Sequence, residues 1–210
     1  SEIEFQQAVE NLIALTQEKL DTLPESDLFT FLEKELLLGT PTTRGIIHEF
    51  LDNERNRKLE VKPSYFEVPI GKRIGGRQNT DNILFSEEVV QVGKVKIRGK
   101  VDRIDVSNNH FTVIDYKTGS NIPTIDDIRS GLSLQLPIYL YVIELLISKK
   151  LQMQLSPAAG LYYILKSSID EQFGLSNKEL DGVGFNLNKK RKGFVDNDEE
   201  LRKIINESIK

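Results

Sequence analysis

Two aspartates and a lysine stand close together in the middle of the chain, each within a short apolar run. Asp102 belongs to the segment Gly99-Lys-Val-Asp-Arg-Ile-Asp, and Asp115 and Lys117 belong to Val113-Ile-Asp-Tyr-Lys-Thr-Gly. A pair of carboxylates can hold a divalent cation, which polarises a phosphate oxygen and acidifies a bound water. A lysine ammonium beside them can stabilise developing negative charge or orient the attacking water. The combination suits hydrolysis of a phosphodiester bond.

The first aspartate is expected on a basic strand face. If residues 94–106 form one unbroken strand, alternation places Asp102 beside four cations, which are Lys94, Lys96, Arg98 and Lys100. Such a face could hold a phosphate backbone. An Asp-x-Lys pair taken alone is more often an exposed ion pair at a strand edge. Strand length also leaves open whether Asp102 reaches Asp115, although a turn at 107–109 allows antiparallel pairing.

The elements that must position these residues follow from apolar periodicity, glycine and proline. Helices are expected over 2–23, 26–38, from Thr40 onward, 125–129, 132–149 and 199–209. Strands are expected over 65–70, 82–92, 94–106, 110–117 and 158–166, with loop-rich chain over 71–81 and 167–193. This order predicts an α/β fold, a mixed central sheet flanked by helices. We expect residues 1–39 to form an N-terminal helical segment packed on a core of residues 40–210.

Composition narrows the chemistry further. The 210 residues contain no cysteine and only two histidines, at a net charge of −4. Disulfides, zinc ribbons, iron–sulfur clusters and thiol catalysis are excluded, so oxygen ligands and hence Mg²⁺ or Mn²⁺ are favoured. No apolar run is long enough to span a membrane and no signal peptide is expected, which fits a cytoplasmic location. The first residue is not methionine, which indicates a piece of a longer protein.

Four motifs in a fixed order, between about residues 40 and 166, make the chain resemble a known nuclease family. The first is helical and the others surround the two aspartates or follow them. They are Gly45-Ile-Ile-His, the double segment from Gly99 to Gly119, Leu134-Gln-Leu-Pro-Ile-Tyr, and Ala159-Gly-Leu-Tyr-Tyr-Ile-Leu-Lys. Together they resemble the RecB/AddB-type nuclease domain of the PD-(D/E)XK nuclease superfamily, and imply its restriction-endonuclease-like core.

The resemblance implies a role for each matching residue. It makes Lys117 the catalytic lysine and places Gln135 and Tyr139, one helical turn apart, over the active site. The implied ligands of Mg²⁺ or Mn²⁺ are His48, Asp102, Asp115 and the backbone carbonyl of Tyr116. The implied DNA contacts are Lys100, Arg103, Gln135 and Tyr139. Glu67, in Tyr65-Phe-Glu-Val-Pro, corresponds to a further acidic position of the family.

Several of these residues also have a purely structural interpretation. His48 could be a boundary residue of an amphipathic helix, and Gln135 and Tyr139 could simply border the core. Arg103 could pair with a carboxylate instead of DNA. Asp105 is expected to be structural because it falls off the face that carries Asp102. The basic run 189–192 is expected to be a solvated loop, with DNA contact as the alternative.

The resemblance implies a divalent-metal-dependent DNA nuclease, an exonuclease, that belongs to a larger helicase–nuclease of double-strand break repair. The chain lacks the four cysteines with which many AddB-type nucleases hold an iron–sulfur cluster. It also lacks a Gly-x-x-x-x-Gly-Lys-Ser/Thr loop, so ATP hydrolysis would belong to a helicase module or subunit that acts as its partner. The alternatives are a catalytically inactive nuclease-like module for DNA binding or scaffolding, and a relative that cleaves RNA or a restriction site.

Overall fold

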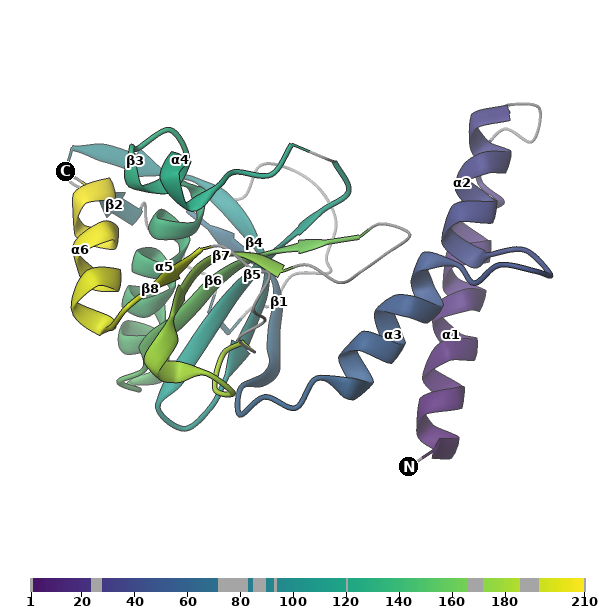
Figure 1. The fold of residues 1–210 in the computed structure, drawn as a ribbon, viewed down its shortest axis with the longest axis horizontal. Helices are drawn as coiled ribbons and strands as arrows, with labels where there is room; N and C mark the ends of the chain where they lie inside the picture. The colour runs from purple at the N-terminus through teal and green to yellow at the C-terminus, as the bar shows by residue number, and fades with distance from the viewer. Residues whose placement is uncertain are drawn as a thin grey trace. The chain divides into compact units, whose positions relative to one another are not determined.

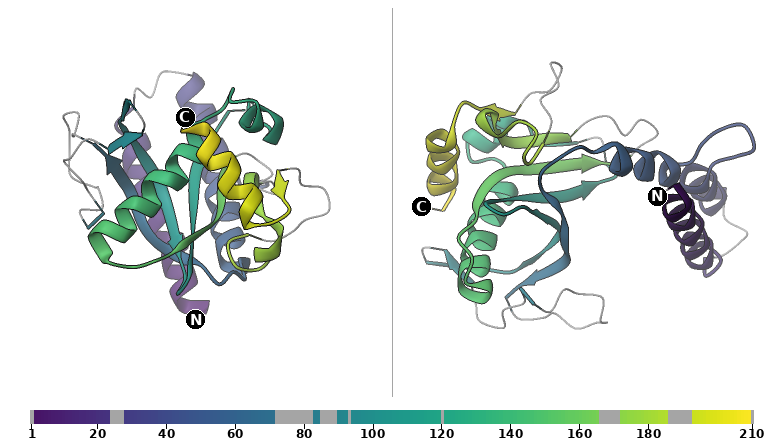
Figure 2. Two further views of the ribbon diagram at one scale, coloured as in Figure 1. Left: turned by 90° about the vertical axis from the view of Figure 1, so that its left-hand side faces the viewer. Right: turned by 90° about the horizontal axis from the view of Figure 1, so that it is seen from below.

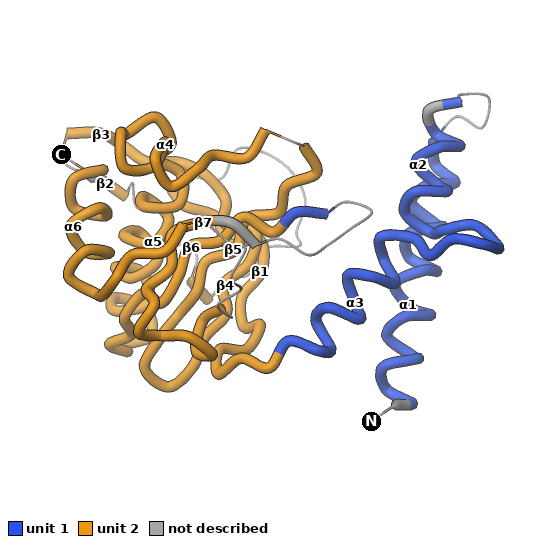
Figure 3. The backbone as a smooth tube through the Cα atoms, in the orientation of Figure 1, with its two compact units in different colours: residues 1–57, 164–170 blue, residues 58–163, 171–210 orange. Residues whose placement is uncertain are grey.

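The computed structural model describes residues 2–23, 28–71, 83–84, 90–92, 94–119, 121–165, 172–185 and 193–209. The chain divides into two compact units (Figure 3). The first contains residues 1–57 and 164–170, and the second contains residues 58–163 and 171–210. The third helix is thus grouped with the first two, whereas the sequence assigns residues from 40 onward to the nuclease core. The functional domain boundary at residue 39 stays a prediction.

The first unit is helical. It contains α1 (Glu2–Leu20), α2 (Leu28–Leu38) and α3 (Ile46–Asn56), which contact one another. The predicted helix start at Thr40 is wrong, because the backbones of Thr40 and Thr43 bond to each other in a turn and Gly39 bridges Arg44. The helix begins only after Gly45, where a Cβ would collide with the Leu37 carbonyl oxygen.

The second unit is built on a six-stranded mixed sheet (Figure 1). Its order is β1-β4-β5-β6-β7-β8, with antiparallel pairing of β1 with β4, β4 with β5 and β6 with β7, and parallel pairing of β7 with β8. The strands are β1 (Lys62–Ile70), β4 (Gly99–Val106), β5 (His110–Lys117), β6 (Ser156–Ile164), β7 (Gln172–Asn177) and β8 (Phe194–Val195).

Two strand predictions need correction. The expected single strand over 94–106 is divided at Arg98, because β3 (Val95–Ile97) pairs with β2 (Val90–Val92) in a separate sheet. The continuous basic face is therefore interrupted before Lys100. The segment expected to be loop-rich over 167–193 contains β7. The basic run 189–192 and most of the expected strand over 82–92 lie outside the described residues.

Helices pack against this sheet (Figure 2). The helices are α4 (Ile125–Arg129), α5 (Gln135–Leu146), which continues as a π-helical turn Ile147–Leu151, the 3₁₀ turn Lys178–Leu180 and α6 (Asp198–Ser208). The long helix α5 contacts β5 and β7, and α6 contacts α5, β7 and β8. The approach of α5 is close at Gly160 of β6, where a Cβ would lie 3.2 Å from Leu136 Cβ. The predicted α/β class, a mixed sheet flanked by helices, is confirmed.

The core of the second unit lies between the sheet and α5. Val101, Ile104, Val113, Leu136 and Leu140 are fully buried there. Burial of this much apolar surface fixes the orientation of α5 and therefore the positions of Gln135 and Tyr139. Among the described residues, no helix is both long and apolar enough to cross a membrane.

Candidate active site

The hairpin of β4 and β5 brings the two candidate aspartates together. Val106 pairs with Phe111 and Arg103 pairs with Ile114, so one further step places Asp102 across from Asp115. The backbone N–H of Tyr116 donates to Asp102 Oδ2 at 2.9 Å, which ties this carboxylate to β5. The short turn after Val106 sets this register, so counting outward from the turn would have placed the two carboxylates side by side.

Asp115 and Lys117 share one face of β5 and meet the first residue of α5. The Lys117 ammonium lies 2.5 Å from Asp115 Oδ2 in an ion pair, and it donates to Gln135 Oε1 at 3.2 Å. The side-chain amide of Gln135 donates in turn to Asp115 Oδ1 at 2.6 Å. Gln135 therefore bridges the Asp115 carboxylate and the Lys117 ammonium, and holds both in one orientation.

Tyr139 completes this side of the site. Its hydroxyl donates to the backbone carbonyl of Lys100 at 3.0 Å, and Gln135 Nε2 lies 3.4 Å from the same hydroxyl. Burial raises the pKa of Tyr139, which the hydrogen bond from Gln135 only partly offsets, so this hydroxyl is a neutral donor at physiological pH. The predicted cluster of Asp102, Asp115, Lys117, Gln135 and Tyr139 is thus assembled in the second unit.

Burial and the neighbouring carboxylate of Asp115 both act on Asp102. Burial raises the pKa of Asp102, the neighbouring Asp115 raises it further, and the hydrogen bond from Tyr116 opposes both. Burial alone would lower the pKa of Lys117, but the hydrogen bond and charge of Asp115 outweigh it and raise this pKa. Lys117 is therefore an ammonium at neutral pH and acts as a cation, not as a base. One ammonium balances only one of two facing carboxylates.

Tyr162 of β6 also lies at this cluster, and no role for it was predicted from the sequence. The Lys117 ammonium lies 5.3 Å from the centroid of its ring, and Tyr162 is fully buried with its hydroxyl 3.2 Å from Ser133 Oγ. A ring face attracts a cation at this range. Because side chains alternate along a strand, the Tyr-Tyr sequence at 162–163 must send one ring to each face of the sheet. That signal could have identified one of the two as a neighbour of the lysine.

Lys100 is exposed and forms an ion pair with Glu67 of β1. The hydrogen bond to Glu67 raises the pKa of Lys100, so its charge is retained. In the pairing of β1 with β4, Phe66 lies opposite Arg103 and Val68 lies opposite Val101, so Glu67 lies across from Asp102. The backbone of Glu67 has a positive φ of 54°. A non-glycine residue rarely adopts this conformation in a strand, and such strain collects at functional sites.

Arg103 occupies a different environment from the one expected of a DNA contact. Only 2% of its surface is exposed, and its Nε and Nη2 donate to the two carboxylate oxygens of Asp105 at 2.6 and 2.9 Å. A buried guanidinium held in this bidentate manner is not offered to a DNA backbone. The predicted DNA contact of Arg103 is therefore not supported. The alternative prediction, that Arg103 pairs with a carboxylate, describes its contacts, and this pair agrees with a structural role for Asp105.

His48 lies in the first turn of α3, in the first unit. Its Nδ1 has no hydrogen-bond partner among the described residues. Its approach to Asp102 and Asp115 stays a prediction. Within the described ranges, no three His, Asp or Glu side chains gather in a way that could hold a metal ion by themselves.

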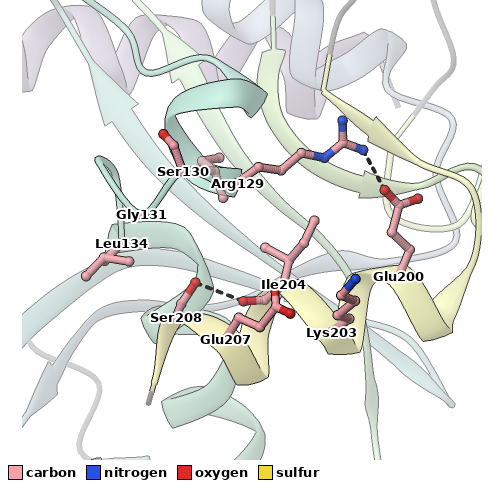
Figure 4. A pocket seen from close by; sticks show the side chains of 10 residues that line it. Arg129, Ser130, Gly131, Leu134, Glu200, Lys203, Ile204, Glu207 and Ser208 are labelled. Carbon is pink, nitrogen blue, oxygen red and sulfur yellow. Dashed lines mark hydrogen bonds and ion pairs between the residues drawn. The ribbon is translucent and has the colours of Figure 1, made fainter.

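A pocket of about 550 Å³ lies elsewhere in the second unit, between the end of α4 and α6 (Figure 4). It is lined by Arg129, Leu134, Lys203, Glu207 and their neighbours, and Arg129 is paired with Glu200 at 2.5 Å. None of the candidate site residues lines this pocket. The chemistry suggested by the sequence therefore belongs to the β4–β5 hairpin and α5.

Comparison with known proteins gives consistent results. The family model described as the PD-(D/E)XK nuclease superfamily matches residues 3–209. The chain is similar to an ATP-dependent helicase/deoxyribonuclease subunit of Alkaliphilus metalliredigens, with 29% identity over 93% of this chain and 18% of that protein. The protein of the same name from Carboxydothermus hydrogenoformans is 30% identical over 94% of this chain and 20% of its own length. The chain thus spans about a fifth of the length of these relatives.

Proposed function

Because the chain belongs to the PD-(D/E)XK nuclease superfamily, we propose that it is a divalent-metal-dependent DNA nuclease domain of RecB/AddB type. We further propose that it acts as an exonuclease within a larger helicase–nuclease of double-strand break repair. Its partners would be DNA and a helicase module or subunit. The names of its relatives, which join a helicase to a deoxyribonuclease, support this setting.

The donor set fits a divalent cation. Asp115 Oδ2 is buried, and its partner among the described residues is the Lys117 ammonium at 2.5 Å. Asp102 faces Asp115, and burial of this pair is costly without added positive charge. Asp102, Asp115, the Tyr116 carbonyl and His48 would hold Mg²⁺ or Mn²⁺. When bound, the ion supplies Lewis-acid polarisation of a phosphate oxygen and acidification of a water.

The residues of the chain supply the rest of the chemistry. Lys117, a fixed ammonium, stabilises negative charge that develops on the phosphate as water oxygen attacks phosphorus. Gln135 holds Lys117 and Asp115 at their positions, and Tyr139 is placed to position the phosphate or the water. The bond from phosphorus to the 3′ oxygen breaks, and that oxygen takes up a proton. The products carry 5′-phosphate and 3′-hydroxyl ends.

DNA binding is proposed for the exposed part of this cluster. Lys100 presents an exposed ammonium two strand positions from Asp102, and its partner Glu67 is half-buried. A phosphate could compete with Glu67 for this ammonium. Gln135 and Tyr139 would contact the phosphate at the site itself.

The observation that carries the proposal is the single cluster formed by Asp102, Asp115, Lys117 and Gln135. The test is cleavage of end-labelled single- and double-stranded DNA with Mn²⁺ or Mg²⁺. We expect wild type to cleave, and Asp115→Ala and Lys117→Ala each to lose activity by at least about 10²-fold. Full cleavage by either variant would show that the site is assigned wrongly.

The rival function is a nuclease-like module that binds DNA without cleaving it. The filled positions at Asp102, Asp115 and Lys117 favour the enzyme. Titration with Mn²⁺ distinguishes the nuclease from the binding module. A nuclease of this kind should bind Mn²⁺, and the Asp115→Ala variant should not. Retained DNA affinity without Mn²⁺ binding at millimolar concentration would favour the module.

A further inference from the structure

A polar cluster, buried at Arg103 and Asp105 and half-buried at Tyr116, lies on the sheet face opposite to the candidate active site. It consists of Arg103, Asp105, Tyr116 and Tyr163, which we call the back-face cluster. Arg103 binds both oxygens of Asp105, and its Nη1 donates to the Tyr116 hydroxyl at 3.2 Å. The Tyr116 and Tyr163 rings meet edge to face with centroids 5.6 Å apart. Alternation along β4 and β5 sends these side chains away from Asp102, Asp115 and Lys117.

The back-face cluster reaches the active site through the backbone of Tyr116. This residue stands between Asp115 and Lys117, and its N–H donates to Asp102 Oδ2 at 2.9 Å. The same peptide segment carries the carbonyl proposed as a metal ligand. Because Tyr116 is held at its ring and at its hydroxyl, its backbone has little freedom to rotate. Arg103, itself held at two atoms by Asp105, holds that hydroxyl through its Nη1.

Stabilisation of the fold does not by itself explain why Arg103 and Asp105 form a buried ion pair on this face of the sheet. Arg103 is 2% exposed and Asp105 is fully buried, so both charges lose their hydration. Apolar side chains of similar volume often stabilise a protein as well as a buried ion pair does, and a buried pair is better suited to fixing one geometry. Outer contacts that orient a metal ligand commonly determine metal affinity.

We propose that Arg103 is a positioning residue for the metal site, acting through the Tyr116 hydroxyl on the Tyr116 peptide. The proposal rests on the function proposed above, since it concerns the same site. Arg103 does not touch DNA or metal. It keeps the N–H of Tyr116 on Asp102 and the carbonyl of Tyr116 in place for the ion.

Two variants of the 210-residue chain test this role. Tyr116→Phe removes the hydroxyl but keeps the ring. The double variant Arg103→Met with Asp105→Leu replaces the buried pair with apolar side chains, which should leave the unfolding temperature near that of wild type. We expect both to raise the Mn²⁺ dissociation constant about tenfold by calorimetric titration. In metal-free protein, hydrogen exchange at the Tyr116 amide should become faster in both.

Thr112→Val is the matched control. Thr112 lies on the same face of β5, is fully buried, and its hydroxyl donates to the Gly184 carbonyl at 3.3 Å. Its replacement removes one buried hydrogen bond from the same strand without touching Tyr116. We expect this variant to bind Mn²⁺ as wild type does and to leave exchange at the Tyr116 amide unchanged.

The outcomes distinguish the positioning role from the proposed function. If wild type binds Mn²⁺ in a manner that Asp115→Ala abolishes, while Tyr116→Phe and the double variant bind as tightly as wild type, the positioning role is overturned and the proposed function stands. If wild type shows no Asp115-dependent binding, both fall together. Should the double variant fail to fold, the Tyr116→Phe measurement decides alone.

Discussion

Gln135 is the residue whose contacts most constrain the chemistry. Its amide donates to Asp115 Oδ1 at 2.6 Å and its carbonyl accepts from Lys117 Nζ at 3.2 Å, so a single side chain fixes the acid and the ammonium together. The pairing also determines which way the amide is oriented, because only this orientation satisfies both partners. Displacement of either group by about an ångström can cost on the order of 10²-fold in rate.

Gln135→Leu tests this role at nearly constant side-chain volume. We expect kcat to fall by about 10- to 100-fold because the reacting geometry is disturbed, with a smaller rise in KM for DNA because one phosphate contact is lost. Gln154→Leu is the matched control, because Gln154 is exposed and its amide donates to Ser148 Oγ, away from the cluster. It should cleave at the wild-type rate. A rise in KM at unchanged kcat for Gln135→Leu would contradict a role in positioning.

At the scale of elements, α4 controls the connection from β5 to α5. Thr124 caps this helix in a capping box: its hydroxyl accepts from the Asp127 N–H at 3.2 Å, and Asp127 Oδ2 accepts from the Thr124 N–H at 2.7 Å. The Asp127 carbonyl then accepts the N–H groups of Leu132 and Ser133, just before Gln135. The cap therefore orders the chain that leads from Lys117 to Gln135.

This cap should make stability depend on pH. Hydrogen bonds from the Thr124 backbone and hydroxyl lower the pKa of Asp127 in the folded protein. The stabilisation is full above the unfolded pKa of about 3.9 and disappears as pH falls through the lower folded value. Asp127→Ala should lower the unfolding temperature by a few degrees at pH 7, and this difference should shrink in acid.

The pKa of Asp127 can also be measured directly, by carbon-detected NMR titration of its carboxyl. We expect this pKa to lie below the ordinary aspartate range. Asp126→Ala serves as control, because Asp126 is an exposed carboxylate of the same helical turn. It shares the favourable charge at the helix N-terminus but not the capping box. An equal loss of stability in Asp126→Ala would assign the effect to helix charge instead of the cap.

At the scale of the whole molecule, local signals predict the elements that carry the chemistry. Strand β5 spans His110–Lys117 and helix α4 spans Ile125–Arg129, as predicted, because apolar runs and the turns between them are local features. The grouping of Asp102, Asp115, Lys117, Gln135 and Tyr139 in one place follows from the family resemblance. Periodicity alone does not place Asp102 opposite Asp115.

The features that the sequence does not reveal have nonlocal causes. Strand β7 is expected to be loop because the segment over 167–193 is polar. Its pairing with β6 is close, since a Cβ at Gly174 would collide with the Gly160 carbonyl oxygen. The break at Arg98 depends on the pairing of β3 with β2. The burial of Arg103 depends on Asp105, which the alternation rule places on the same face without indicating that this face is covered.

Metal binding, as proposed, would draw ligands from both units. All the clustered residues lie in the second unit and His48 lies in the first. If His48 completes the metal shell as predicted, its imidazole nitrogen binds the ion directly. The chain contains one other histidine, His110, at the opposite end of β5 from Lys117. Five residues of strand, about 17 Å, separate it from Asp115.

The two histidines therefore provide a measurement with its own control. On titration with paramagnetic Mn²⁺, we expect the imidazole NMR signals of His48 to broaden at low stoichiometry and those of His110 to broaden far less. His48→Ala should weaken Mn²⁺ binding by about 10-fold or more and reduce the gain in unfolding temperature on adding Mn²⁺. Broadening near Asp115 and Lys117 with sharp His48 signals would mean that the second unit binds the ion without α3. The metal shell would then need another ligand. Glu67 is the candidate, because it lies across from Asp102 on β1 and its charge raises the pKa of that residue.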